Sequence, residues 1–273
     1  MYPIKFKPQL KENIWGGQRL LDIKKGLYSR TIDKSKAYGE SWDISGVKGS
    51  ISKVANGFLK GNNLQEIIEV YMGELVGEEV FEQFGLDFPL LIKNLDCNDT
   101  LSVQVHPDDE LAEERHDSFG KTEMWYVVSA ESGAGVYLGP SREVTREELR
   151  LRAESGSLEE ILRFVPVASG DVIYIPAGTI HSICGGVLVY EIQESSDITY
   201  RLYDYMRRDS EGRLRELHLD RALDVACLKP YEAPPRVKLS EDIMAVCDYF
   251  EARKCKLNFT KATYFADKSS FST

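Results

Sequence analysis

The sequence predicts a mainly β protein, built as an antiparallel barrel or sandwich with helical insertions. Several segments alternate apolar and polar residues with period two, as half-buried strands do. Gly-rich turn sequences such as WGG, YGES and SGVKGS punctuate residues 1–60. The strand-like segments do not alternate regularly with helical ones, which disfavours a doubly wound parallel sheet.

Residues 1–60 are expected to form short strands and loops, and the first helical pattern follows them. Asn63 is a candidate N-cap for this helix. The apolar residues at helical spacing after it are Leu64, Ile67, Ile68 and Tyr71. We therefore predict a short helix or a helix pair, inserted between strands at about residues 62–84.

Two strands are expected next, over residues 88–96 and 101–106, separated by an Asn-Asp turn sequence. We predict that these two strands pair as a hairpin. In the second strand, period-two alternation places three apolar residues on one face and Ser102, Gln104 and His106 on the other. The second face is therefore polar and rich in possible metal ligands.

A helix is predicted over residues 107–120, which begin with proline and acidic residues and end at glycine. The strand after it, over residues 121–128, places Lys121, Glu123 and Trp125 on one side. The sequence that follows, SGAGVYLG, is typical of a further hairpin. An ammonium and a carboxylate are thus expected on the same strand face.

Residues 144–164 are predicted to form a second helical insertion. The pattern indicates two short helices separated at Ser155 and Gly156, the second capped by Ser157. Three further strands are expected at residues 170–178, 186–193 and 198–205, and a last helix at 218–227.

One proline-rich stretch, residues 229–239, is interpreted as a linker. It divides a core domain of residues 1–228 from residues 240–273. The latter segment contains strand-like pieces but no histidine. We predict that it is the start of a second β domain, and that this second domain is incomplete.

Composition and charge narrow the class of protein. With 42% hydrophobic and 29% charged residues, the chain resembles an ordinary globular protein. It contains no apolar stretch of the ~20 residues that span a bilayer, and its first residues lack the apolar core of a secretory signal. The formal net charge of −10 argues against nucleic acid as a partner but permits an anionic small molecule in a locally basic pocket.

The cysteines favour a reducing compartment. There are five, an odd number, without CxxC pairing and mostly in apolar surroundings: Cys97, Cys184, Cys227, Cys247 and Cys255. Buried, reduced thiols are therefore expected instead of disulfides. Together with the lack of a signal sequence, this predicts a cytoplasmic location.

Three residues predicted on different strands, His106, Glu123 and His181, form a candidate metal site. Two imidazoles and one carboxylate, with space beside them for water or substrate, are typical of an open catalytic site and not of a closed structural one. A single histidine is more often a structural residue. Only the combination of both histidines with a carboxylate favours a metal.

Several motifs carry a resemblance to known proteins. The segment GDVIYIPAGTIH, residues 170–181, resembles the second conserved motif of the cupin barrels. More narrowly, QVHPDD, KTEMWYV, IPAGTIHSI and EIQESSDITYRLYDY, in this order, resemble type I mannose-6-phosphate isomerase (phosphomannose isomerase) in its short bacterial form. The resemblance runs from residue 1 to roughly residue 230 and implies a cupin-type double-stranded β-helix, or jelly-roll barrel.

The resemblance also implies an activity and a cofactor. The family interconverts D-mannose 6-phosphate and D-fructose 6-phosphate through an enediol or enediolate and uses zinc, so one Zn²⁺ per chain and a sugar phosphate substrate are expected. By position, the implied metal ligands are Gln104, His106, Glu123 and His181. The first of these is the weakest assignment, because an amide is a poor zinc ligand.

By the same resemblance, Arg201, Lys121 and Glu191 are expected in the active site as catalytic residues. Lys121 and Arg201 are also expected to contact the substrate, and Ser102 corresponds to a position near the sugar phosphate. These roles are implied by the family and do not follow from composition or spacing.

The residues themselves leave alternatives open. Either Lys121 or Glu191 can act as the base if its pKa lies near neutrality, and each can instead form a structural salt bridge. Arg201 can bind phosphate or stabilise enediolate oxygens, and it can also pair with Asp197 or Asp204.

Two other functions fit the same sequence. Two histidines and a carboxylate also form the facial triad of non-haem iron oxygenases, although the basic residues of the pocket suit a phosphate better. A noncatalytic, sugar-binding cupin is the other alternative, favoured by the incomplete second domain. The sequence leaves the oligomeric state open.

Overall fold

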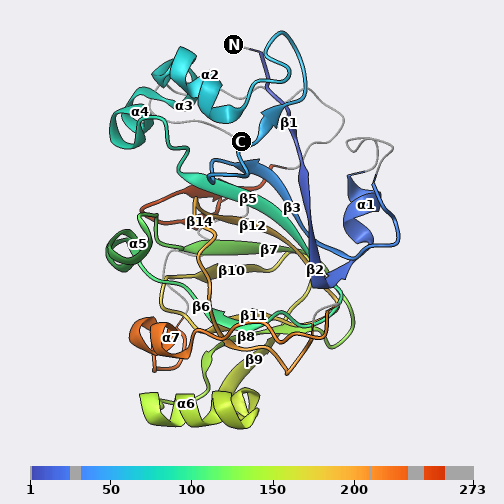
Figure 1. The fold of residues 1–273 in the computed structure, drawn as a ribbon, viewed down its shortest axis with the longest axis vertical. Coiled ribbons are helices and arrows are strands. Elements are labelled where there is room, and N and C mark those ends of the chain that lie inside the picture. The colour runs from blue at the N-terminus through green and yellow to red at the C-terminus, as the bar shows by residue number, and fades with distance from the viewer. Residues whose placement is uncertain (1, 25–31, 209–210, 233–242, 256–273) are drawn as a thin grey trace.

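The core of the protein is a pair of antiparallel sheets that face each other, seen in a computed structural model that describes residues 2–24, 32–208, 211–232 and 243–255 (Figure 1). The larger sheet contains, in spatial order, β10 (Val172–Ile175), β7 (Glu123–Ala130), β12 (Val187–Glu194), β5 (Leu90–Cys97), β2 (Gln9–Gly17) and β3 (Tyr38–Ser45). The smaller contains β13 (Tyr200–Tyr203), β6 (Val103–Val105), β11 (His181–Ile183), β8 (Gly135–Pro140) and β9 (Leu162–Pro166). The predicted mainly β class and antiparallel barrel are confirmed.

One part of the space between the sheets is filled by apolar side chains. Trp125 and Val127 of β7 pack there with Val136 and Leu138 of β8 and with Ile183 of β11. Because these strands belong to different sheets, the cluster holds the two layers together. The polar residues of the candidate site occupy a neighbouring part of the same interior.

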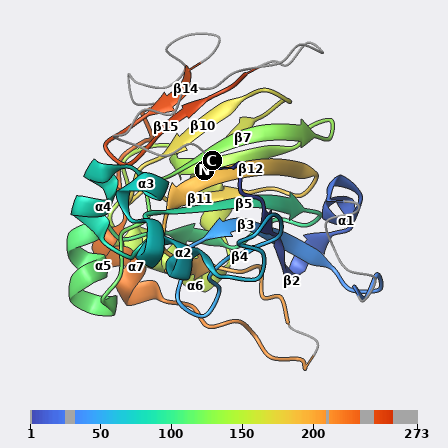
Figure 2. The ribbon, with the colours of Figure 1, turned by 90° about the horizontal axis from the view of Figure 1, so that it is seen from above.

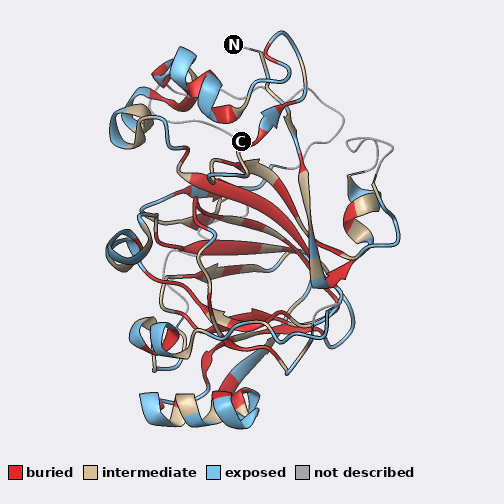
Figure 3. Ribbon diagram, viewed as in Figure 1, coloured by how far each residue is buried: buried red, intermediate tan, exposed pale blue. Residues whose placement is uncertain are grey.

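The outer face of each sheet is covered by helices (Figures 1 and 3). The larger sheet packs against α2 (Leu64–Tyr71), α3 (Gly73–Val76) and α4 (Glu78–Phe84). The smaller sheet packs against α6 (Arg146–Ser155) and α7 (Leu219–Val225), while α1 (Arg19–Ile23) and α5 (Asp109–His116) lie beside the barrel. No helix within the described residues is long and apolar enough to cross a bilayer.

Local sequence signals account for several of these helices. Asn63 caps α2 by accepting a hydrogen bond from the backbone of Glu66, whose own side chain accepts one from the Asn63 backbone. Asp108 and Thr145 cap α5 and α6, and their side chains accept hydrogen bonds from the backbone N–H groups of Leu111 and Glu148. The segments predicted at 62–84, 107–120 and 218–227 do contain helices, although these helices begin and end at other residues than predicted.

Two predicted hairpins are wrong. β5 pairs with β12, β2 and β3, whereas β6 pairs with β11 and β13 in the other sheet. Likewise β8 pairs with β9 and β11 and not with β7. In both cases the chain crosses from one sheet to the other. The apolar residues of β6 are then buried against α6 and α7, whereas Val136 and Leu138 of β8 are buried between the two sheets.

The second helical insertion is shorter than predicted. α6 ends at the left-handed Gly156, as expected, but Leu158–Ile161 form only a 3₁₀ turn, and Ser157 makes no side-chain cap. The chain then continues as β9, and Phe164 lies in this strand beside Tyr137 of β8. Strand pairing therefore overrides the local helical signal.

Two small sheets complete the fold. β1 (Phe6–Lys7) pairs with β4 (Lys53–Val54), and β14 (Ile243–Val246) pairs with β15 (Glu251–Arg253). Figure 2 shows the latter hairpin beside β10, and its Ala245, Phe250 and Ala252 join the cluster on the outer face of the larger sheet. Most of the predicted linker and the last residues lie outside the described residues. The division into a core domain, a linker and a second domain stays a prediction.

Candidate metal centre

The two histidines and the glutamate predicted as a metal site do lie together, between the two sheets. His106 follows β6 directly, His181 opens β11, and Glu123 opens β7 of the opposite sheet. His181 Nε2 lies 3.3 Å from Glu123 Oε1, and His106 Nε2 lies 3.8 Å from Glu123 Oε2. Ligand atoms about 2.1 Å from a tetrahedral ion are roughly 3.4 Å apart, so these spacings suit one shared cation.

Hydrogen bonds from the backbone fix the orientation of both imidazoles. The Nδ1 atom of His106 lies 2.9 Å from the carbonyl of Ile198, and the Nδ1 atom of His181 lies 2.8 Å from the carbonyl of Thr179. A carbonyl can only accept, so each Nδ1 carries the proton. Each Nε2 lone pair therefore points toward Glu123, as a metal ligand requires.

The donor set fits a divalent metal ion. His106 Nε2 and both carboxylate oxygens of Glu123 are fully buried without a hydrogen bond, and of these only Glu123 Oε2 has a charged neighbour outside the cluster among the described residues, the Lys121 ammonium at 3.2 Å. Leaving such atoms without a partner costs about 1–3 kcal/mol each, and more for a charged group. A cation bound by these atoms removes that cost, and two nitrogens with one oxygen are a usual zinc set.

Gln104 lies beside this cluster on the same strand as His106. It faces His181 across the β6–β11 pair, and its side-chain nitrogen lies 3.2 Å from His181 Nε2. Only the amide oxygen can bind a metal, and the two ends of an amide differ by a rotation about χ3. Gln104 is thus within reach as a fourth ligand after its amide turns, and this role stays a prediction.

The electrostatics keep the two imidazoles neutral. Burial lowers the pKa of His181 to about 4. Burial and the charge of Lys121 lower the pKa of His106 well below its ordinary value. Burial and the nearby charge of Glu191 raise the pKa of Glu123 to about 7. A neutral imidazole is the form that binds a metal, so burial prepares both histidines as ligands.

Lys121 and Glu191 also lie inside the barrel, as predicted. Lys121 Nζ is 3.2 Å from Glu123 Oε2. Glu191 sits across from Trp125 on β7, and its Oε2 accepts a hydrogen bond of 2.8 Å from the Trp125 indole. Both side chains are buried, so each is close to the metal cluster and shielded from water.

Lys93 is part of this interior and was not predicted. It faces Glu191 across the β5–β12 pair, and its Nζ lies 3.2 Å from Glu191 Oε1. Although burial opposes the charged form, Glu191 and Glu40 raise the pKa of Lys93. Burial likewise opposes ionisation of Glu191, but Lys93 and Lys121 outweigh it and lower the pKa. The sequence did contain a signal, a lysine within the apolar strand PLLIKNL.

Arg201 and Ser102 belong to the two neighbouring segments at the β13 edge of the smaller sheet. Arg201 is opposite Gln104 in the β13–β6 pair, and its Nη1 donates a hydrogen bond of 2.8 Å to the carbonyl of Glu216. Its Nε is buried and has no hydrogen bond. Ser102 is buried just before β6. An unsatisfied guanidinium N–H near the metal cluster is available for a substrate oxygen.

The Asp204 carboxylate, one of the two expected ion-pair partners of Arg201, binds other arginines in the structure. The Asp204 carboxylate is engaged by Arg207 and Arg215 instead. Burial and the charge of Arg215 lower the pKa of Arg201. His218 makes no side-chain cap for α7, and its Nδ1 accepts a hydrogen bond from the Arg201 backbone.

Comparison with known proteins identifies relatives. Residues 4–129 match the family model described as phosphomannose isomerase type I, catalytic domain. The chain is 40% identical over 268 residues to mannose-6-phosphate isomerase ManA of Bacillus subtilis, covering 94% of this chain and 80% of that one. A crystal structure of the Bacillus subtilis mannose 6-phosphate isomerase matches with a TM-score of 0.78 at 37% identity, covering 92% of this chain and 79% of that chain.

A more distant solved structure, of a zinc-bound mannose 6-phosphate isomerase, shares the fold. It matches with a TM-score of 0.65 at 15% identity, covering 91% of this chain and 82% of that chain. The predicted family is therefore confirmed by identity, by coverage and by fold. The chain belongs to the type I mannose-6-phosphate isomerase family and is an enzyme of that family.

Proposed function

We propose that this enzyme interconverts D-mannose 6-phosphate and D-fructose 6-phosphate with one Zn²⁺ ion per chain. The observation that carries the proposal is the set of buried metal-ligating atoms without hydrogen bonds on His106 and Glu123, completed by His181. A proton-transferring pair and a partly unsatisfied arginine lie in the same interior. The named relatives act as mannose-6-phosphate isomerases, which agrees with this assignment.

The metal is held, in this proposal, by His106, Glu123 and His181, with Gln104 as a weaker fourth ligand. These residues would hold Zn²⁺ where it would supply polarisation of the carbonyl and hydroxyl oxygens of a sugar. The donors are two imidazoles and one carboxylate, a set that occurs in catalytic zinc sites and leaves positions open for solvent or substrate. The chain's own contribution is to present neutral imidazoles and one carboxylate at fixed positions.

Moving a carbonyl between two neighbouring carbons requires that a proton leave one carbon and return to the other. We assign this transfer to Lys121 and Glu191. Glu191 is held ionised and oriented by Trp125 and Lys93, so it can accept a proton. Lys121, which lies just before β7 and 3.2 Å from Glu123, is the proton donor. Which of them acts on carbon is decided by comparing Lys121→Met with Glu191→Gln.

The charged end of the substrate needs a cation that never loses its proton. Arg201 supplies it in this proposal, because a guanidinium stays charged and can hold two oxygens of a phosphate or an enediolate. Ser102 adds a hydroxyl group at the base of the neighbouring strand. Both residues lie on the smaller sheet, so the phosphate is bound beside β6 and β13 while the proton transfer occurs beside β7 and β12.

We also propose a cytoplasmic location. The structure records all five cysteines as free thiols, which fits a reducing compartment. The expectation that they are buried is only partly correct: Cys97 is buried, whereas Cys227 and Cys255 are exposed. An exposed thiol stays in its reduced form more easily in a reducing compartment than in an oxidising one.

A coupled assay tests the function. Purified protein is incubated with D-mannose 6-phosphate, and D-fructose 6-phosphate formation is measured with and without a chelator, then after adding back Zn²⁺. We expect turnover that is lost with the chelator and restored by Zn²⁺. The absence of turnover in a folded, zinc-loaded sample would overturn the proposal, and oxygen uptake with bound iron would point to the facial-triad alternative.

A further inference from the structure

Arg201 lies on an edge strand. β13 ends the smaller sheet, so only one of its sides pairs with another strand, β6. The peptide groups on the other side of an edge strand need separate partners, and without them a strand is free to shift. For a residue proposed to grip substrate oxygens, a shift of about 1 Å can cost ~10²-fold in rate.

The missing partner is a short segment that precedes α7. The backbone N–H of Arg201 donates to His218 Nδ1 over 3.1 Å, and the backbone N–H of His218 donates to the Arg201 carbonyl over 2.8 Å. The Arg201 guanidinium donates to the carbonyl of Glu216 over 2.8 Å. One segment therefore holds the main chain and the side chain of Arg201 at the same time.

Both ends of this segment are anchored. At its start, Arg215 Nε lies 2.7 Å from Asp204 Oδ2, and the Asp204 side chain is buried. At its other end α7 begins, and Ala222 and Leu223 are buried against the smaller sheet. The segment is thus a fixed support, and His218 is the side chain through which it contacts the Arg201 backbone.

We propose that His218 is a positioning residue for Arg201. Its Nδ1 atom accepts the Arg201 amide and so keeps the edge of β13 in register, while Glu216 holds the guanidinium. The inference rests on the proposed function, because it takes Arg201 to act on the substrate. His218 itself lies beside the free edge of β13 and acts through the Arg201 backbone.

Three variants separate positioning from general structural support. In His218→Asn the side-chain oxygen occupies the place of Nδ1, so the acceptor is retained. In His218→Gln the amide group is one carbon farther out and the acceptor at that place is lost. His116→Ala is the matched control, because His116 is also a half-buried histidine, and its Nε2 bonds the hydroxyl of Tyr200, the residue next to Arg201.

In the isomerase assay we expect the Gln variant to lose roughly 10- to 100-fold in kcat/KM with unchanged zinc content, and the Asn variant and the His116 control to stay near the wild type. The loss should affect the same parameter, kcat or KM, that Arg201→Ala affects. In a double-mutant cycle, His218→Gln combined with Arg201→Ala should lose no more than Arg201→Ala alone. Equal loss in the Asn and Gln variants, or additive losses in the cycle, would overturn the proposal.

A second measurement does not depend on turnover. Hydrogen exchange at the Arg201 amide should be faster in the Gln variant than in the Asn variant, because only the former lacks the acceptor. If the two rates agree, the positioning role is wrong whatever the activity. A wild type that exchanges as expected but fails to isomerise would instead overturn the proposed function.

Discussion

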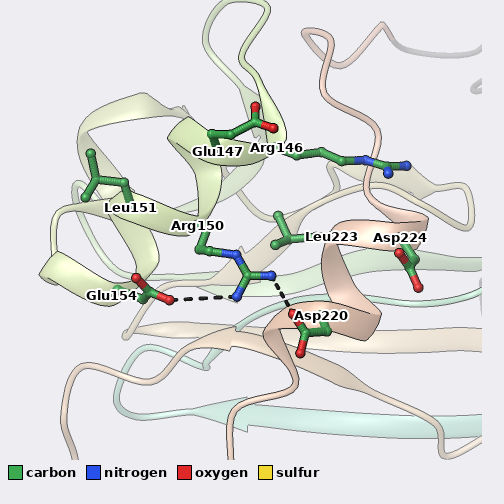
Figure 4. Close-up of a pocket in the computed structure, with 8 residues that line it drawn as sticks. All are labelled: Arg146, Glu147, Arg150, Leu151, Glu154, Asp220, Leu223 and Asp224. Carbon is green, nitrogen blue, oxygen red and sulfur yellow. Dashed lines mark hydrogen bonds and ion pairs between the residues drawn. The ribbon is translucent and has the colours of Figure 1, made fainter.

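Two regions of the molecule gather charged side chains, and they differ in how well those charges are satisfied. Between α6 and α7 a surface hollow of about 480 Å³ is lined mainly by charged residues. Figure 4 shows Arg150 at its centre, paired with Glu154 and Asp220. The charged side chains of the metal centre are buried instead, and His106 and Glu123 keep ligand atoms without hydrogen bonds.

The difference indicates where chemistry is expected. In the hollow, Arg150 has two opposite partners and access to water, so little free energy is available there for binding a ligand. In the barrel, burial makes unsatisfied atoms costly, and a bound cation recovers that cost. A concave surface is therefore a weaker sign of function in this protein than a buried polar atom without a partner.

The largest expected effect comes from removing a metal ligand. His181→Ala should lose bound zinc and lower kcat/KM by about a thousand-fold, because a metal contributes several kcal/mol of charge stabilisation. Metal content by elemental analysis and the isomerase assay measure the two losses. A variant that keeps zinc but not activity, or activity but not zinc, would show that His181 is not a ligand in a catalytic site.

Arg201→Ala should leave the zinc content unchanged and lower kcat/KM by roughly 10²–10³-fold, since one charge-stabilising donor is lost. Comparison with His181→Ala then distinguishes the residues that bind the metal from those that bind the substrate. Steady-state kinetics with elemental analysis provide the test, and loss of zinc in this variant would contradict the division.

A buried carboxylate outside the metal cluster tests the cost of burial alone. Burial, with the charge of Asp109 adding to it, raises the pKa of Glu194 from its ordinary 4.5 to about 8, so between these two pH values the folded protein holds a proton that the unfolded chain releases. Stability should therefore fall as the pH rises from about 5 to 8, by roughly 2–4 kcal/mol from this group. Urea unfolding of Glu194→Gln should show a smaller fall, whereas a parallel pH dependence in both proteins would refute this cause.

The smallest effect is expected in the surface hollow. Arg150→Ala removes an exposed side chain whose partners face water, so turnover, zinc content and the urea midpoint should all match the wild type. A measurable loss of turnover would mean that the hollow contributes to function. The contrast between the two regions would then have to be abandoned.

The faces of the strands could be predicted from the sequence, but not their neighbours. The alternation of apolar and polar residues correctly placed Val103 and Val105 on the outer face of the barrel and Gln104 on its inner face. The expected hairpin between β5 and β6 failed, because adjacent strands with an Asn-Asp turn resemble a hairpin whether they pair or cross between sheets. Pairing depends on distant strands such as β12, which no local pattern identifies.

The metal site was predictable for a related reason. His106, Glu123 and His181 each sit on a strand whose parity points them inward, and the family motifs connected the three segments. Lys93 and His218 escaped prediction, because each contributes through a contact with a residue far away in the chain: Glu191 for one and Arg201 for the other. A lysine or histidine read in isolation carries no sign of such a partner.

By itself, the sequence determined the β class, the inward and outward faces of its strands, and the family to which its motifs belong. These follow from side-chain chemistry repeated over a few residues. Only the tertiary structure decided which strands are neighbours and which charges are left without partners. That is because both depend on contacts between segments far apart in the chain, and the same local pattern can be buried against more than one distant surface.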